Sequence, residues 1–215
     1  MKRLVLPRLY VILDAALLTV PETECAQKLA DAGVRLMQYR NKRASARELF
    51  ESTRRLSSLL IPLGVTFVVN DRADVARAAG TSGVHVGQED LQAKAARSVV
   101  GEGKLLGVST HNVEEFREAA GTSADYIAVG PVFSTSSKAN PDPVVGIEMI
   151  QKVRPLTDKP IVAIGGITLE RAAEVIQAGA DSAAVISGIL LATDPRQRAR
   201  QYIERLEAAK PAAAV

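Results

Sequence analysis

The chain has 215 residues, which suits one compact domain or two very small ones. Hydrophobic residues make up 47% of it but aromatic residues only 4%, so the core must consist of Val, Ile, Leu and Ala, as in a buried parallel sheet. The net charge of +3 comes with too few aromatic side chains for a base-stacking surface, which argues against nucleic acid as a partner and fits a small anionic substrate better.

The N-terminal residues, Met1 to Pro7, are followed by no apolar run that could serve as a signal peptide or cross a bilayer. The single cysteine, Cys25, excludes an internal disulfide and is typical of a reducing compartment. Because it lies in a predicted helix with no basic residue beside it, we expect a buried structural thiol. The chain is therefore expected to be cytoplasmic and free of membrane contact.

Short runs rich in β-branched residues alternate with longer helical stretches along the whole chain. The predicted strands are 9–13, 36–39, 66–69, 83–86, 105–108, 126–129, 161–164 and 183–186. The clearest predicted helices are 21–32, 44–60, 113–120, 169–178 and 195–208. Asn112 is available as the N-cap of the third of these, and helix ends are predicted at Gly33, Gly64 and Gly179.

This alternation predicts a single (β/α)8 TIM barrel that forms one domain over residues 1–215, with a core of about 8–205 and a frayed tail at 210–215. An open doubly wound sheet is the alternative fold. That fold usually has fewer strands and a glycine-rich turn after the first of them. Here the first predicted strand is followed by Asp14-Ala15-Ala16, with no glycine, and this favours the barrel.

Polar and charged side chains follow the predicted strands. In a TIM barrel, residues at the C-terminal ends of the strands face one common mouth, where active sites lie. The residues in such positions are Gln38, Arg40, Lys42, Asn70, Asp71, His85, Gln88, Asp90, Ser109, His111 and Lys138. The sequence therefore predicts an active site at this mouth, in which neither histidine is assigned a catalytic role.

Two of these strand ends indicate an ion site. Asp71 and Asp90 offer carboxylate oxygens of the kind that Mg²⁺ prefers, and the alternative is that each merely caps the following helix.

Glycines in the last two loops, Gly165-Gly166 and Ser187-Gly188, would let main-chain N–H groups approach a phosphate, unless they only form tight turns. The cations Arg40, Lys42 and Lys138 would suit a leaving diphosphate, although a solvated surface charge is the ordinary role of a lysine.

Together these stretches resemble the thiamine phosphate synthase family, also called thiamine-phosphate pyrophosphorylase, over residues of about 8–205. The most specific of them are Gln38-Tyr39-Arg40-Asn41-Lys42, the segments 67–72, 83–90, 107–111 and 125–133, and the pair Gly165-Gly166. The resemblance implies a transferase of thiamine biosynthesis. It would couple 4-amino-2-methyl-5-hydroxymethylpyrimidine diphosphate with 4-methyl-5-(2-hydroxyethyl)thiazole phosphate, using Mg²⁺, to give thiamine phosphate and diphosphate.

The resemblance also implies roles for individual residues. The pyrimidine diphosphate would be held by Gln38, Tyr39, Arg40, Asn41, Lys42, Asn70, Ser109 and Lys138. Of these, Arg40, Ser109 and Lys138 would be catalytic, and Asp71 and Asp90 would bind Mg²⁺. The thiazole phosphate would be held by Thr135, Ser136, Ser137, Gly166, Ile186 and Ser187.

Two positions depart from the family pattern. The family usually has Glu where Asn41 stands, and Thr-x-Thr-Lys where this chain has Thr135-Ser136-Ser137-Lys138, so that Ser137 keeps the hydroxyl. Two alternative functions remain open: a thiazole tautomerase on a similar barrel, and a non-catalytic barrel that binds a phosphate ligand. The expected partners are the small-molecule substrates, and a homo-oligomer is left open.

Overall fold

The computed structural model describes residues 4–135 and 143–210. Its strands are all parallel and form a closed barrel in which each strand pairs with the next and β8 pairs with β1. The predicted TIM barrel is therefore confirmed. The strands are β1 (Leu9–Asp14), β2 (Leu36–Arg40), β3 (Thr66–Asn70), β4 (Gly83–Val86), β5 (Leu105–Thr110), β6 (Tyr126–Val129), β7 (Ile161–Ile164) and β8 (Ser182–Val185).

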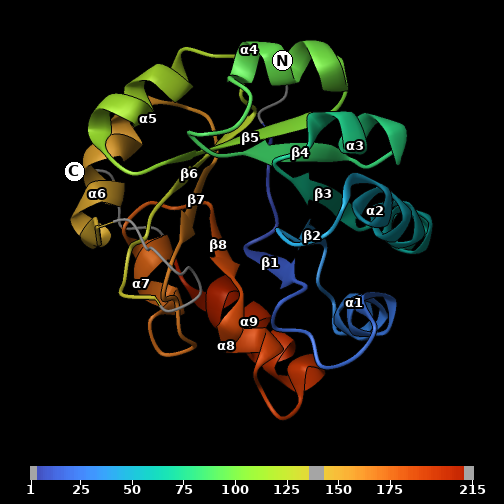
Figure 1. The fold of residues 1–215 in the computed structure, drawn as a ribbon. Helices are drawn as coiled ribbons and strands as arrows, with labels where there is room; N and C mark the ends of the chain where they lie inside the picture. Colours follow the sequence, from blue (N-terminus) through green and yellow to red (C-terminus); the bar gives the residue numbers. More distant parts are fainter. Residues whose placement is uncertain (1–3, 136–142, 211–215) are drawn as a thin grey trace.

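Helices surround these strands as an outer ring (Figure 1). They are α1 (Glu22–Asp31), α2 (Ala46–Leu60), α3 (Ala73–Ala78), α4 (Ala93–Val100), α5 (Val113–Ala120), α6 (Gly146–Val153), α7 (Ala172–Gln177), α8 (Ser187–Leu190) and α9 (Pro195–Ala208). Short 3-10 turns, Ile61–Leu63 and Arg154–Leu156, follow α2 and α6. Within the described ranges, no helix is both long and apolar enough to cross a membrane.

Local sequence explains where the best-defined helices begin. Asn112 caps α5 as predicted, because its side chain accepts a hydrogen bond of 2.8 Å from the Glu115 N–H. A capping box formed by Ser45 and Glu48 begins α2 two residues later than predicted. Cys25, on α1, is buried and free, which confirms the expected buried thiol.

The strand side chains divide into two buried clusters, one outside the barrel and one inside it. This division shows which side chains face the interior and reach the barrel mouth. One cluster joins strand residues such as Val11 and Phe67 to the helices outside the barrel. The other consists mainly of strand residues and fills the barrel interior, as Tyr10, Val68 and Tyr126 do. Because side chains alternate along a strand, every second residue faces inward. The inward set ends in polar residues at the barrel mouth: Asp14, Gln38, Arg40, Asn70, His85 and Ser109.

Two arginines stabilise the opposite, N-terminal end of the barrel by the same arrangement. Arg97, at the end of α4, donates to Asp125 (2.6 Å) and to the main-chain oxygens of Gly101, Lys104 and Ser123. Arg154, just after α6, likewise donates to Asp181 (2.7 Å) and to nearby main-chain oxygens. In both cases the aspartate also accepts a main-chain N–H from the start of the preceding strand. The chemistry at the mouth is thus separated from the clamps at the base.

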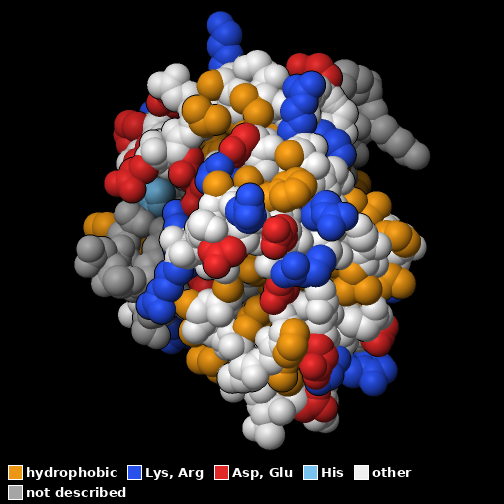
Figure 2. Space-filling model, turned by 45° about the vertical axis from the view of Figure 1, so that its right-hand side comes forward, with side chains coloured by type: hydrophobic (Ala, Val, Ile, Leu, Met, Phe, Trp, Pro, Cys, Tyr) orange, Lys and Arg blue, Asp and Glu red, His pale blue; other side chains and the backbone are white. Residues whose placement is uncertain are grey.

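On the outer helices, ion pairs include Lys28–Glu24 (2.7 Å) and Arg55–Glu22 (3.2 Å). On the face drawn in Figure 2, basic and acidic side chains lie beside one another across the surface. Such exposed pairs contribute little to stability, because solvent and salt screen them.

Candidate active site

The carboxylates predicted to bind Mg²⁺ lie at the C-terminal ends of neighbouring strands. Asp71 directly follows β3, and its N–H donates to the His85 carbonyl on β4 over 2.7 Å. Asp90 lies in the loop after β4 and accepts a hydrogen bond of 2.8 Å from the Gly87 N–H. Burial raises the pKa of the Asp90 carboxyl, and the adjacent Asp71 carboxyl raises it further. The two acidic groups are therefore held together at one point of the mouth.

Helix capping, the alternative role for these aspartates, is wrong. The N-cap of α3 is Arg72 and that of α4 is Gln92, and neither helix has a side-chain cap. Asp71 instead adopts a left-handed backbone, with a φ of 64°, and no other non-glycine residue in the described ranges has a positive φ. Such a conformation is costly for most side chains, so the backbone is constrained here for a reason other than helix capping.

Two cations are anchored beside these carboxylates by acidic partners. Lys42 lies past the end of β2, and its Nζ is 2.5 Å from Asp71 Oδ2. Arg40, the last residue of β2, pairs with the buried carboxylate of Asp14, the last residue of β1. Asp14 is a site residue that sequence reasoning missed. Lys138, the third predicted cation, lies outside the described residues, as do Ser136 and Ser137.

A chain of hydrogen bonds crosses the barrel interior below the mouth and joins two predicted ligand-binding residues, Gln38 and Ser109. Gln38 Nε2 lies 2.7 Å from Tyr10 Oη, which lies 3.1 Å from Tyr126 Oη. Tyr126 Oη is 3.1 Å from His85 Nδ1, and His85 Nε2 is 2.8 Å from Ser109 Oγ. Alternation along the strands could have shown that these side chains face the barrel interior, but not that they contact one another, and sequence reasoning assigned no role to the tyrosines or to His85.

Gly166 lies in the β7–α7 loop beside the loop that follows β6, close to Phe133 and Ser134. A Cβ atom at Gly166 would lie only 2.3 Å from the Ser134 carbonyl oxygen, and Gly166 has a φ of 63°. The glycine is therefore required for close packing, whether or not it also contacts a phosphate. The helix predicted over 169–178 begins three residues later, at Ala172, so that residues 167–171 belong to the loop.

The β8 loop does enter a helix directly. Ser187 is the first residue of the short helix α8, and Ile186 immediately precedes it on the inward side of β8. A Cβ atom at Gly188 would lie 2.4 Å from Tyr202 Oη, a hydroxyl that donates to the Ile167 carbonyl in the neighbouring loop. The described residues predicted to hold the thiazole phosphate thus lie beyond β6, β7 and β8. Those predicted to hold the diphosphate and the metal lie beyond β2 to β5.

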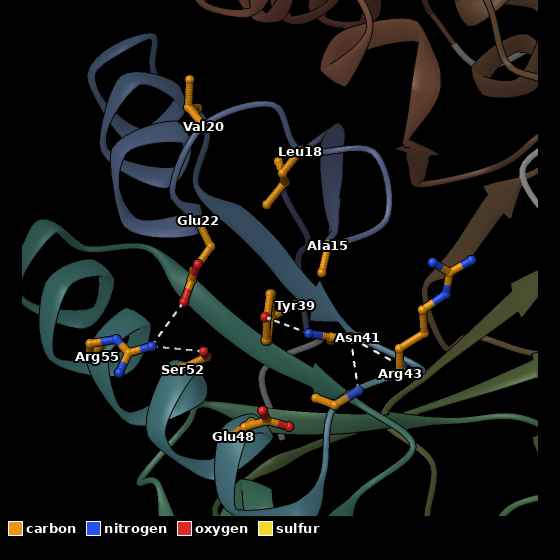
Figure 3. Close-up of a pocket in the computed structure, with 11 residues that line it drawn as sticks. Ala15, Leu18, Val20, Glu22, Tyr39, Asn41, Arg43, Glu48, Ser52 and Arg55 are labelled. Atoms are coloured by element: carbon orange, nitrogen blue, oxygen red, sulfur yellow. Dashed lines mark hydrogen bonds and ion pairs between the residues drawn. The ribbon is translucent and has the colours of Figure 1, made fainter.

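Two of the predicted residues are placed elsewhere. Tyr39 faces outward from β2, and the Asn41 amide donates to its hydroxyl over 3.2 Å. Both residues line a pocket of about 490 Å³ between the start of α1 and the N-terminal part of α2 (Figure 3). The Asn41 side chain also accepts from the N–H groups of Arg43 and Ala44, so it shapes the β2–α2 loop. These two side chains do not share the mouth that Gln38 and Arg40 line.

Comparisons with known proteins agree over nearly the whole chain. A family model described as thiamine monophosphate synthase matches residues 9–189. A thiamine-phosphate synthase from Koribacter versatilis is 52% identical over 208 residues, which cover 94% of this chain and 96% of that protein. One from Chloroflexus aurantiacus is 43% identical and covers 90% of each chain. A solved thiamine phosphate pyrophosphorylase from Pyrococcus furiosus matches with a TM-score of 0.85 at 34% identity, covering 94% of this chain and 96% of that one.

Proposed function

The chain belongs to the thiamine monophosphate synthase family, and on this premise we propose that its barrel mouth couples a pyrimidine diphosphate to a thiazole phosphate. The protein is a transferase of thiamine biosynthesis. In the proposed reaction, the C–O bond between the pyrimidine methylene and the diphosphate breaks, and the diphosphate leaves with the electron pair. The thiazole nitrogen then uses its own lone pair to form the new C–N bond. The products are thiamine phosphate and diphosphate.

One observation carries this proposal: Arg40, Lys42, Asp71 and Asp90 gather at adjoining strand ends, opposite a separate set of loops beyond β6 to β8. Positive charge at the first group would stabilise the negative charge that develops on the leaving diphosphate. The second group would position the nucleophile, with Ser187 and the Gly166 loop facing its phosphate. Because the thiazole nitrogen already carries a lone pair, the reaction requires no general base.

The residues present suit Mg²⁺. Two carboxylates held side by side repel each other, and Lys42, which pairs with Asp71, lowers the pKa of Asp90 by less than burial and the Asp71 carboxyl raise it. We propose that Asp71 and Asp90 hold the ion, since Mg²⁺ takes one or two carboxylates and completes its shell with water and phosphate oxygens. When bound, Mg²⁺ would neutralise charge on the diphosphate. Lys42 would then be available to the same diphosphate.

The alternative functions are less well supported. A thiazole tautomerase needs only the thiazole phosphate site, so it leaves the carboxylate pair and its two anchored cations unexplained. A non-catalytic phosphate binder leaves the same groups unexplained, and the relatives that match most of the chain are named as synthases. We also propose a cytoplasmic location, which the single buried thiol of Cys25 supports because a reducing compartment leaves such a thiol free.

The proposal is tested by mixing both substrates with the protein and Mg²⁺, and by detecting thiamine phosphate through its fluorescence after oxidation. We expect product and released diphosphate only when both substrates are present. Each substrate alone serves as a control. Conversion of the thiazole phosphate alone, without coupling, would replace the synthase with the tautomerase, and binding without turnover would replace it with the non-catalytic barrel.

A further inference from the structure

The five side chains that connect Gln38 to Ser109 are built into the barrel interior. Gln38, Tyr10, Tyr126 and His85 have exposed fractions of 2%, 1%, 0% and 7%. They come from β2, β1, β6 and β4, so this series of hydrogen bonds spans the barrel and does not follow one strand. The Tyr126 and His85 rings are also stacked, with centroids 5.5 Å apart. A connection of this kind holds each member in one orientation.

The sequence provides the space for this contact at Gly107 on β5. A Cβ atom at Gly107 would lie 2.1 Å from Tyr126 Cζ and 2.4 Å from His85 Nδ1. No positive φ requires glycine at this position, so the requirement comes from the neighbouring rings. A side chain here would separate Tyr126 from His85.

The chemistry of the groups sets the direction of the hydrogen bonds. The amide nitrogen of Gln38 can only donate, so Tyr10 accepts from it. Burial raises the pKa of Tyr10 to about 12 and also raises the pKa of Tyr126, so both hydroxyls keep their hydrogens. Tyr10 then donates to Tyr126, and Tyr126 donates to His85 Nδ1. In the reverse direction, the Tyr10 hydrogen would have no acceptor among the described residues, and a buried donor without an acceptor is unfavourable.

We propose that Tyr10, Tyr126 and His85 are positioning residues. The two tyrosines hold His85 as its Nε2–H tautomer, and His85 in turn orients the Ser109 hydroxyl. Ser109 Oγ then accepts from His85, and the Ser109 hydroxyl turns its own hydrogen toward the ligand in the barrel mouth. This inference rests on the proposed function, in which Ser109 holds the pyrimidine diphosphate. The serine would donate to a hydrogen-bond acceptor of that substrate, and its donor role would be fixed before the substrate binds.

The tautomer can be read without substrates. The chain has only two histidines, so ¹⁵N-histidine NMR gives two sets of ring signals, and the His111→Gln variant identifies those of His85. We expect His85 Nε2 to carry the proton and Nδ1 to be an unprotonated acceptor. In Tyr126→Phe, where Nδ1 has lost its donor, we expect a mixture of the two tautomers. Tyr10→Phe breaks the connection one link farther away and should shift the same signals less.

A kinetic measurement separates positioning from general stability. Tyr126→Phe should lower kcat/KM for the pyrimidine diphosphate by about 10-fold and leave KM for the thiazole phosphate within about twofold. Thr81→Val is the control, because it also removes a buried hydroxyl but lies before β4, at the base of the barrel and outside this connection. It should lower the melting temperature without changing kcat/KM for the pyrimidine diphosphate.

Two results would overturn the inference. One is wild-type His85 with its proton on Nδ1, or on both nitrogens. The other is an equal kinetic effect of Tyr126→Phe and Thr81→Val. Absence of thiamine phosphate formation by the wild-type protein would count against the proposed function instead, and the NMR measurement would still decide the tautomer.

Discussion

Asp14 and Arg40, the last residues of the neighbouring strands β1 and β2, form an ion pair at the mouth of the barrel. The Asp14 carboxylate is 3% exposed and also accepts a hydrogen bond of 3.0 Å from the Ala16 N–H. Two contacts therefore fix the carboxylate, and the carboxylate in turn fixes the guanidinium. Arg40 would thus meet a diphosphate as a group already oriented, which saves the entropy of ordering a long side chain during binding.

Asp14→Asn should reduce catalysis through Arg40. The amide keeps the shape of the carboxylate but loses the charge that orients the guanidinium. We expect kcat/KM for the pyrimidine diphosphate to fall by about 10-fold, equivalent to about 1.4 kcal/mol, with little change in KM for the thiazole phosphate. Steady-state kinetics with each substrate varied in turn measures this.

The control for this prediction is Asp181→Asn at the opposite end of the barrel. It removes the partner of Arg154 in the same way but lies far from the mouth. This variant should unfold at lower denaturant concentration and keep the kinetics of the wild type. If both variants change only stability, Asp14 has no part in positioning Arg40.

The proposed Mg²⁺ site predicts a steep loss of turnover in Asp71→Asn and Asp90→Asn, by about 10²-fold or more. Asparagine is the right replacement at position 71, because with a φ of 64° most other side chains would add backbone strain of about 1–2 kcal/mol. A chelator should abolish the wild-type activity, and added Mg²⁺ should restore it. Turnover measured over a range of Mg²⁺ concentrations tests the three expectations together.

Asp74→Asn provides the matched variant for the carboxylate pair. Asp74 is on α3, three residues after Asp71, and pairs with Arg72 in an exposed position. Its replacement should leave the Mg²⁺ dependence as it is in the wild type. If Asp71→Asn and Asp90→Asn both keep activity close to that of the wild type at low Mg²⁺, then these two aspartates do not bind the metal.

The strands could be predicted well because they are buried on both faces, so their Val, Ile and Leu runs stand out. β4, β6 and β7 have the predicted bounds, whereas β1, β2, β3 and β5 extend one or two residues farther than predicted. The added residues include Asp14, Arg40 and Asn70, which are polar and therefore look like loop. They belong to the strands because their main chains continue to pair with the neighbouring strand, as Asp14 does with Arg40 and Asn70 with His85.

The site was harder to predict where the residue type did not decide the direction of the side chain. Gln38 and Tyr39 are adjacent in one motif, yet alternation along β2 sends Gln38 into the barrel and Tyr39 toward the helices. The link between Tyr10 and Tyr126 joins residues 116 positions apart, which no local pattern encodes. Such contacts follow from barrel closure and not from sequence spacing.

The base of the barrel gives a prediction about stability. Arg97 has a side chain that is 10% exposed, and its loss would leave several main-chain oxygens without this donor and Asp125 without its cationic partner. Arg97→Ala should therefore destabilise the fold by about 2–4 kcal/mol, less than a fully buried pair because Asp125 is partly exposed. Urea unfolding of this variant, of Asp125→Ala and of the double variant would give the coupling energy. Additive effects would show that the pair itself contributes nothing.

The last prediction concerns the separation of the two anion sites. Lys42 lies beyond β2, whereas Ser187 lies beyond β8, in the loops expected to hold the thiazole phosphate. Position 166 is unsuitable for a test, because any side chain there would collide with the Ser134 carbonyl and could disturb the fold by itself. Ser187→Ala removes only a hydroxyl, and Lys42→Ala removes only an exposed cation, so both variants should fold normally.

Ser187→Ala should weaken binding of the thiazole phosphate by about 10-fold, about 1.4 kcal/mol, and leave the pyrimidine diphosphate within about twofold. Lys42→Ala should show the opposite selectivity, because its charge lies beside Asp71. Calorimetric titration of each substrate separately, with Mg²⁺ present, measures both affinities. Lys28→Ala and Ser98→Ala on the outer helices are the matched controls and should change neither affinity. Equal losses for both ligands in either site variant would mean that the two phosphate groups share one site.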